Sequence, residues 1–93
     1  MEKFHLTEEE RMEIINKFFK NNQLHVIPSK EKYKIVILNF LIEKFNPNKQ
    51  YTEPEINQVL KSFYPDFAIL RRYLVDYKLL DRSKDCRLYW VKE

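Results

Sequence analysis

Apolar side chains recur along the chain at the three- to four-residue spacing of amphipathic helices, in four separate segments. The first helix is predicted to begin at Thr7, because Thr7 and Glu10 form the T-x-x-E pattern of a capping box. It is predicted to stop near Asn21-Asn22, with a linker over residues 22–28. Its apolar stripe consists of Met12, Ile15, Phe18 and Phe19.

The second helix is predicted to run from Ser29, as its N-cap, to about Phe45, and it is apolar on two sides. One side carries Ile35, Leu38, Leu41, Ile42 and Phe45, and the other carries Tyr33, Val36, Ile37 and Phe40. A helix that is apolar on both sides is buried on both sides. We therefore expect the first helix to cover one side and the rest of the chain to cover the other. The alternative is a protein-interaction or dimer interface through the second set.

The third helix follows an Asn46-Pro47-Asn48 turn and a very short strand at residues 49–51. Thr52 and Glu55 repeat the capping-box pattern, and Pro65 is predicted to end the helix. The expected buried stripe is Ile56, Val59, Leu60 and Phe63.

The fourth helix is predicted to begin at Asp66, and it contains two adjacent arginines. Its buried stripe is Phe67, Leu70, Tyr73, Leu74 and Tyr77. With 3.6 residues per turn, Arg72 faces away from this stripe together with Ala68 and Val75, and Arg71 lies on the flank. The arginines therefore do not interrupt the predicted core.

Two strands at residues 79–82 and 87–91 flank the turn Ser83-Lys84-Asp85-Cys86 and predict a β-hairpin. The resulting order is helix, helix, short strand, helix, helix, hairpin. This is the order of a winged helix-turn-helix with an extra N-terminal helix. We expect a mainly α fold with a small β-hairpin in a single domain over residues 1–93, with the N-terminal helix in 1–22 and the winged-helix core in 29–91.

The amino-acid composition excludes several classes of function but does not identify one. The chain has 93 residues, a net charge of +3, one cysteine and no glycine. The absence of glycine excludes the glycine-rich loops that cradle phosphates, and a single cysteine cannot form an intrachain disulfide. The sequence shows no signal peptide and no apolar run long enough to span a bilayer, so a cytoplasmic location without membrane association is expected.

Basic side chains on the fourth helix and at the hairpin are the candidate nucleic-acid contacts. The predicted set is Ala68, Arg71, Arg72, Val75, Lys84 and Arg87. Arginines on such a helix can bind phosphates or a guanine edge in a major groove. The alternative is a solvated helix face with an Arg72–Asp76 pair, and an exposed turn at Lys84 and Arg87.

No pattern of catalytic residues is recognised. His5 and His25 have no metal-ligand spacing to each other, and the lone Cys86 is the least favoured starting point for an activity. The aromatic residues Tyr73, Tyr77, Tyr89 and Trp90 are expected to fill the core rather than to stack on bases. No enzymatic activity, cofactor or small-molecule ligand is therefore expected.

The motifs "PSKEKYK", "YTEPEIN", "LRRYLVD" and "RLYW" carry a resemblance that covers Pro28 to Trp90. In this region the chain resembles the bacterial domain-of-unknown-function family 2087, which occurs alone and joined to transcriptional regulators. The resemblance implies a winged-helix-like fold and a regulatory role associated with DNA. The chain has Lys78 and Cys86 where that family commonly has glycine. A left-handed residue is expected at Lys78, at a cost of roughly 1 kcal/mol.

The function expected from the sequence is therefore that of a non-enzymatic, DNA-binding domain of a transcription regulator. The alternative is a protein-interaction or dimerisation module that does not bind DNA, because one fold can serve either purpose. The expected partners are accordingly duplex DNA, a second copy of the chain, or a regulator protein.

Overall fold

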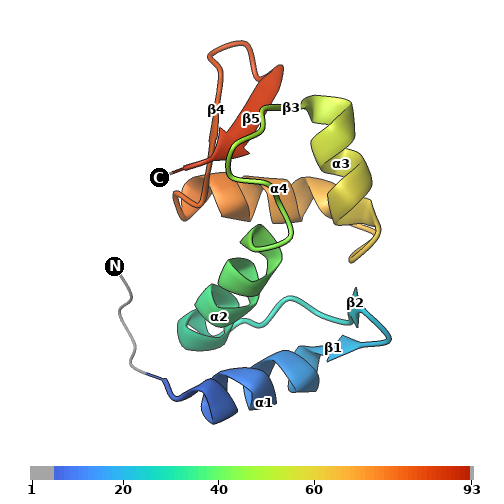
Figure 1. The fold of residues 1–93 in the computed structure, drawn as a ribbon. Helices are drawn as coiled ribbons and strands as arrows, with labels where there is room; N and C mark the ends of the chain where they lie inside the picture. The colour runs from blue at the N-terminus through green and yellow to red at the C-terminus, as the bar shows by residue number, and fades with distance from the viewer. Residues whose placement is uncertain (1–5, 93) are drawn as a thin grey trace.

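The computed structural model describes residues 6–92, which form four helices and two small antiparallel sheets (Figure 1). The helices are α1 (Glu8–Phe18), α2 (Glu31–Ile42), α3 (Glu53–Lys61) and α4 (Phe67–Asp76). Strands β1 (Phe19–Lys20) and β2 (Gln23–Leu24) form one sheet. Strands β3 (Tyr51–Thr52), β4 (Leu80–Arg82) and β5 (Leu88–Val91) form the other, in the order β3-β5-β4. The predicted mainly helical fold with a small C-terminal hairpin is confirmed.

Capping boxes begin α1 and α3, as predicted. The Thr7 hydroxyl accepts a hydrogen bond from the Glu10 backbone N–H at 3.1 Å, and the Thr7 N–H donates to the Glu10 carboxylate at 3.0 Å. Thr52 and Glu55 make the same pair of bonds at 3.3 and 2.8 Å. Each box satisfies two backbone N–H groups that have no partner within the helix.

Helix α2 lies between α1 and α4 (Figure 1). Its buried residues are Val36, Ile37, Leu38 and Leu41. Three of these are consecutive in the sequence, so they point in different directions around the helix and must be covered from more than one side. The expectation that α1 covers one side of α2 and the rest of the chain covers the other is confirmed.

Several predicted boundaries were wrong. Helix α2 begins at Glu31 after Lys30, whose side chain makes no capping hydrogen bond, so Ser29 is not the N-cap. It ends at Ile42 rather than near Phe45, and α3 ends at Lys61, before Pro65. Short strand β3 covers Tyr51–Thr52 rather than residues 49–51.

The predicted linker after the first helix contains a hairpin instead. Helix α1 ends at Phe18, and Phe19 pairs with Leu24 across the two-residue turn Asn21-Asn22. Both asparagines have positive φ, 53° and 64°, as the common two-residue hairpin turn requires. Leu24 is buried, and its N–H donates to the Phe63 carbonyl at 2.8 Å, so the hairpin is joined to the end of α3.

Within α1, the stripe predicted from spacing is shifted. Met12 is 40% exposed, whereas Ile14 and Ile15 are buried. In α3, by contrast, Ile56 and Leu60 are buried as predicted.

Helix α4 ends in a Schellman motif centred on a lysine. The Leu79 N–H donates to the Leu74 carbonyl at 2.9 Å, and the Lys78 N–H donates to the Val75 carbonyl at 3.0 Å. Lys78 has φ of 63°, so the expected left-handed residue at this position is confirmed. The Cβ of Lys78 makes this conformation less favourable than it would be for glycine.

The β4–β5 hairpin also turns through a left-handed residue. In the turn the Cys86 N–H donates to the Ser83 carbonyl at 2.9 Å, and Cys86 has φ of 62°. The two strands are antiparallel, with Leu80 opposite Val91 and Arg82 opposite Tyr89. Lys78 and Cys86, which stand where the resembled family commonly has glycine, therefore both adopt the left-handed backbone conformation that favours glycine.

We expect Lys78→Gly and Cys86→Gly each to raise the free energy of unfolding by about 0.5–1 kcal/mol, because glycine adopts positive φ without a Cβ clash. Urea denaturation measures the change. The matched control is Lys84→Gly in the same turn, since Lys84 is not among the described residues with positive φ. If Lys84→Gly stabilises the chain as much as Cys86→Gly does, left-handed strain is not the cause.

Acid should weaken the start of α3 through Glu55. The backbone N–H of Thr52 donates to the Glu55 carboxylate, which lowers the pKa of Glu55 below its ordinary value of 4.5. A pKa that is lower in the folded state gives stability that is present above the unfolded pKa and is lost as pH falls through the folded pKa.

In Glu55→Gln the amide oxygen can still accept this hydrogen bond but does not titrate. Wild type should therefore lose more unfolding free energy than Glu55→Gln as the pH falls from about 5 to about 3. Urea unfolding at a series of pH values tests this, and parallel pH profiles for the two proteins would contradict it.

Candidate nucleic-acid interface

Helix α4 is oriented by its cap and by its buried stripe. The Asp66 carboxylate accepts a hydrogen bond from the Ile69 N–H at 3.4 Å. Leu70 and Leu74 are fully buried, whereas Tyr73 on the same side is half-buried. Of the residues predicted to face outward, Ala68 and Arg72 are exposed and Val75 is half-buried. The division of the helix into a buried side and a side bearing Arg72 is as the periodicity predicted.

The Arg71 side chain is mostly buried and contacts other residues of the chain. Its guanidinium donates a hydrogen bond to the side-chain oxygen of Asn57 on α3 and lies 4.0 Å from the Glu53 carboxylate. It also lies 6.0 Å from the ring centroid of Tyr89 on β5. Only 22% of the side chain is exposed. Arg71 therefore joins α3, α4 and the sheet, and its Nη1 is engaged with Asn57 and Glu53 within the chain.

Arg72 is the exposed arginine of the two. Its side chain is 82% exposed, and its Nε lies 3.8 Å from the Asp76 carboxylate one turn further along α4. An exposed pair at this spacing contributes about 0.3–0.5 kcal/mol, so it offers little resistance to a competing anion. The guanidinium is available for an external contact.

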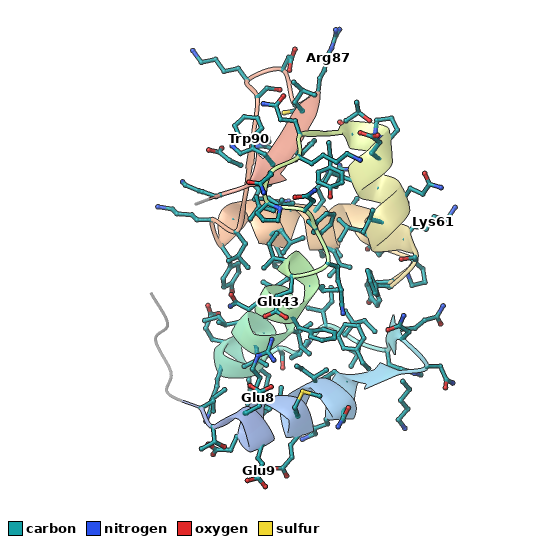
Figure 2. All side chains as sticks on the ribbon, in the orientation of Figure 1. Glu8, Glu9, Glu43, Lys61, Arg87 and Trp90 are labelled. Carbon is teal, nitrogen blue, oxygen red and sulfur yellow. The ribbon has the colours of Figure 1, made fainter. Side chains whose placement is uncertain are left out.

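The turn of the β4–β5 hairpin carries Lys84 and Arg87, and both are exposed. Figure 2 shows the Arg87 side chain projecting from the hairpin tip. It is 85% exposed, with its Nε 3.8 Å from the Asp85 carboxylate. Asp85 also accepts hydrogen bonds from the Ser83 hydroxyl and the Arg87 N–H, which lower its pKa. Asp85 thus stays ionised and orders the turn.

The structure brings the predicted contact residues together in two groups. Ala68, Arg72 and Val75 lie on one side of α4, and Lys84 and Arg87 lie at the hairpin tip. Of the predicted contact residues, Arg72 and Arg87 each have an aspartate beside them. The surface is therefore only moderately cationic.

The aromatic side chains divide between the core and the surface. Tyr89 is buried on the side of the sheet that faces Arg71. Tyr73 and Tyr77 are half-buried, with ring centroids 6.3 Å apart, and both pack against the core. The Tyr77 hydroxyl donates to Glu31 at 2.9 Å; burial and this bond raise the pKa of Tyr77.

Trp90 does not follow the prediction that it fills the core. Neighbouring residues of a strand point to opposite faces, and Tyr89 points inward. Trp90 therefore lies on the outer face of the sheet, half-buried and outside the core cluster. Figure 2 shows it on the side of β5 away from α3.

The predicted interaction face of α2 is not a free surface. Val36 and Ile37 are buried within the chain itself. Tyr33 and Phe40 are half-buried, and they contact Phe18 and Phe19 at ring-centroid distances of 5.9 and 5.1 Å. Tyr33 and Phe40 are therefore only partly accessible to a partner.

Residues 6–92 contain no group of three or more His, Cys, Asp or Glu side chains placed to hold a metal ion. His25 is exposed, and His5 lies outside the described residues. Cys86 is a half-buried free thiol. No helix in the described part of the chain combines the length and the apolar character needed to span a bilayer.

Sequence reasoning missed a groove beside the start of α2. It is lined by Lys17, Phe18, Val26, Ile27, Pro28, Ser29, Lys30 and Tyr33. The signal was present in "HVIP", because a run of two apolar residues before a proline is unusual in a solvated linker. The Arg71–Asn57 contact was also missed, since it joins residues on two different helices.

These features define a small, mainly helical domain in which a short hairpin packs beside a helix pair joined by Arg71. Residues 23–91 match the family described as uncharacterized proteins conserved in bacteria, domain-of-unknown-function family 2087. The chain belongs to this family, which confirms the resemblance found in the sequence. The match begins at β2, so α1 lies outside it. Comparisons with curated proteins and with solved structures gave no match.

The two arginines should respond differently to truncation. Arg71→Ala removes a charged hydrogen bond and leaves Asn57 without its partner, so we expect the free energy of unfolding to fall by about 1–2 kcal/mol. Arg72→Ala should change it by less than about 0.5 kcal/mol. Urea denaturation of both variants tests this. Arg71→Lys is the matched control, because lysine keeps the charge but not the planar fork, and it should recover only part of the loss.

Proposed function

We propose that this chain is a winged-helix domain that binds duplex DNA in transcription regulation, without enzymatic activity. The element order α2-β3-α3-α4-β4-β5 supports the fold, since α3 and α4 would be the helix-turn-helix pair and the β4–β5 hairpin the wing. The sheet order β3-β5-β4 supports it further, because the hairpin is tied back to the strand that precedes α3.

The observation that carries the proposal is the exposure of Arg72. In this fold α4 is the recognition helix, and its outward side is the side that enters a groove. Arg72 stands on that side with the small Ala68 one turn before it, so a base pair or phosphate can approach closely. Lys84 and Arg87 on the wing add contacts to the sugar-phosphate backbone. Arg71 supports α4 from within rather than touching DNA.

A protein-interaction module is the second candidate function. The observation that favours it is the aspartate beside each of two predicted contact arginines, Asp76 beside Arg72 and Asp85 beside Arg87. A surface built mainly to neutralise phosphates would carry a larger excess of positive charge. On this reading the same surface binds a protein through mixed charges.

DNA binding is tested by fluorescence anisotropy with a labelled duplex of mixed sequence, of about 20 base pairs, over a range of salt concentrations. Changing Arg72, Lys84 and Arg87 together to alanine should weaken binding at least about tenfold. It should also reduce the slope of log affinity against log salt by up to about 0.9 for each lost phosphate contact.

The matched control is Lys20→Ala. Lys20 is an exposed lysine on β1, which lies at the end of the molecule opposite the β4–β5 hairpin (Figure 1). The affinity of Lys20→Ala for the duplex should equal that of wild type. Absence of binding at about 50 mM salt would overturn the proposal in favour of the interaction module. An equal loss in Lys20→Ala would show only unspecific attraction.

A further inference from the structure

A groove of about 480 Å³ opens between the end of α1 and the segment that leads into α2. Phe18 and Tyr33 contribute aromatic rings whose centroids lie 5.9 Å apart. Val26, Ile27 and Pro28 contribute an aliphatic wall. Val26 is 52% exposed, and among the described residues only it and Met12 are large apolar side chains classed as exposed. The groove therefore leaves apolar surface in contact with water.

Two lysines border this apolar surface. The Lys17 ammonium lies 5.5 Å from the ring centroid of Tyr33, and the Lys30 ammonium lies 5.7 Å from the same centroid. Neither lysine forms an ion pair with any residue between 6 and 92. Two positive charges thus lie beside one aromatic ring, and neither is paired with a carboxylate of residues 6–92. An anionic group placed there would be attracted to both.

We propose that this groove binds a short acidic peptide segment of another protein, with a bulky apolar side chain against Val26 and Phe18 and carboxylates beside Lys17 and Lys30. Charge complementarity selects the acidic residues, and the aliphatic and aromatic lining selects the apolar one. The volume is in the range of grooves that accept a few side chains.

The lining argues against nucleic acid as the occupant. Contacts to a phosphate backbone come mainly from charged and polar groups, and an aliphatic wall contributes nothing to them. The groove also lies at the α1 end of the molecule, whereas the β4–β5 hairpin lies at the other end (Figure 1). This peptide site is therefore separate from the surface proposed for DNA and does not depend on it.

The test is an NMR titration of the isotope-labelled chain with a defined heptapeptide, a phenylalanine flanked on each side by glutamates. Saturable shifts are expected at the amides of Phe18, Val26, Ile27 and Lys30. In Lys17→Glu/Lys30→Glu the affinity should fall at least about tenfold, because two attractions become repulsions. Val26→Ser should also weaken binding, and because this side chain is exposed the fold should tolerate the change.

The matched control is Lys61→Glu, at the end of α3 (Figure 2), which should bind the peptide as wild type does. A second peptide with glutamine in place of glutamate should bind weakly. The proposal is overturned by any of three results: no saturable shift up to about 1 mM peptide, an equal loss in Lys61→Glu, or shifts confined to α4 and the hairpin. A concentration-dependent rise in mass that Lys17→Glu/Lys30→Glu abolishes would make the occupant a second copy of the chain, and would also overturn it.

Discussion

The architecture depends on the need to cover α2 from more than one side. Val36, Ile37 and Leu38 are consecutive, so they spread around more than half of the helix, and each is buried. Fully burying a side chain of this size contributes about 1.5–3 kcal/mol, so no arrangement that leaves one side of α2 in water is competitive. Helix α1 therefore covers one side, and α4 with the elements that follow it covers the other. The groove and the outward side of α4 are both consequences of this arrangement.

Sequence could predict the elements whose signals are local. The Thr7–Glu10 and Thr52–Glu55 boxes form between residues three apart, so neither depends on the rest of the fold. The β1–β2 hairpin was missed because two-residue strands are too short to show alternation, although the Asn21-Asn22 pair is itself a turn signal. The start of α2 was misplaced because Ser29 is a good N-cap by residue type, whereas the helix begins after Lys30, whose side chain makes no capping hydrogen bond.

For the candidate site, the sequence could predict on which side of a helix each residue lies. Periodicity correctly separated Arg72 from the buried stripe and put Arg71 on the flank. It could not reveal that Arg71 binds Asn57, because that contact depends on how α3 and α4 pack. For the same reason the groove was invisible, since Phe18 and Val26 meet only after the hairpin reverses the chain. Local patterns place side chains on faces, and tertiary packing decides which of them remain free.

The position of Trp90 determines what the intrinsic fluorescence of this protein reports. Trp90 is the only tryptophan in the chain, and it lies on the outer face of the sheet rather than in the core. Its emission follows the environment of the β4–β5 hairpin, so a ligand that settles on the hairpin changes the spectrum while the interior stays intact. Conversely, we expect partial unfolding confined to α1 and α2 to change the emission little, because Trp90 lies outside the core cluster.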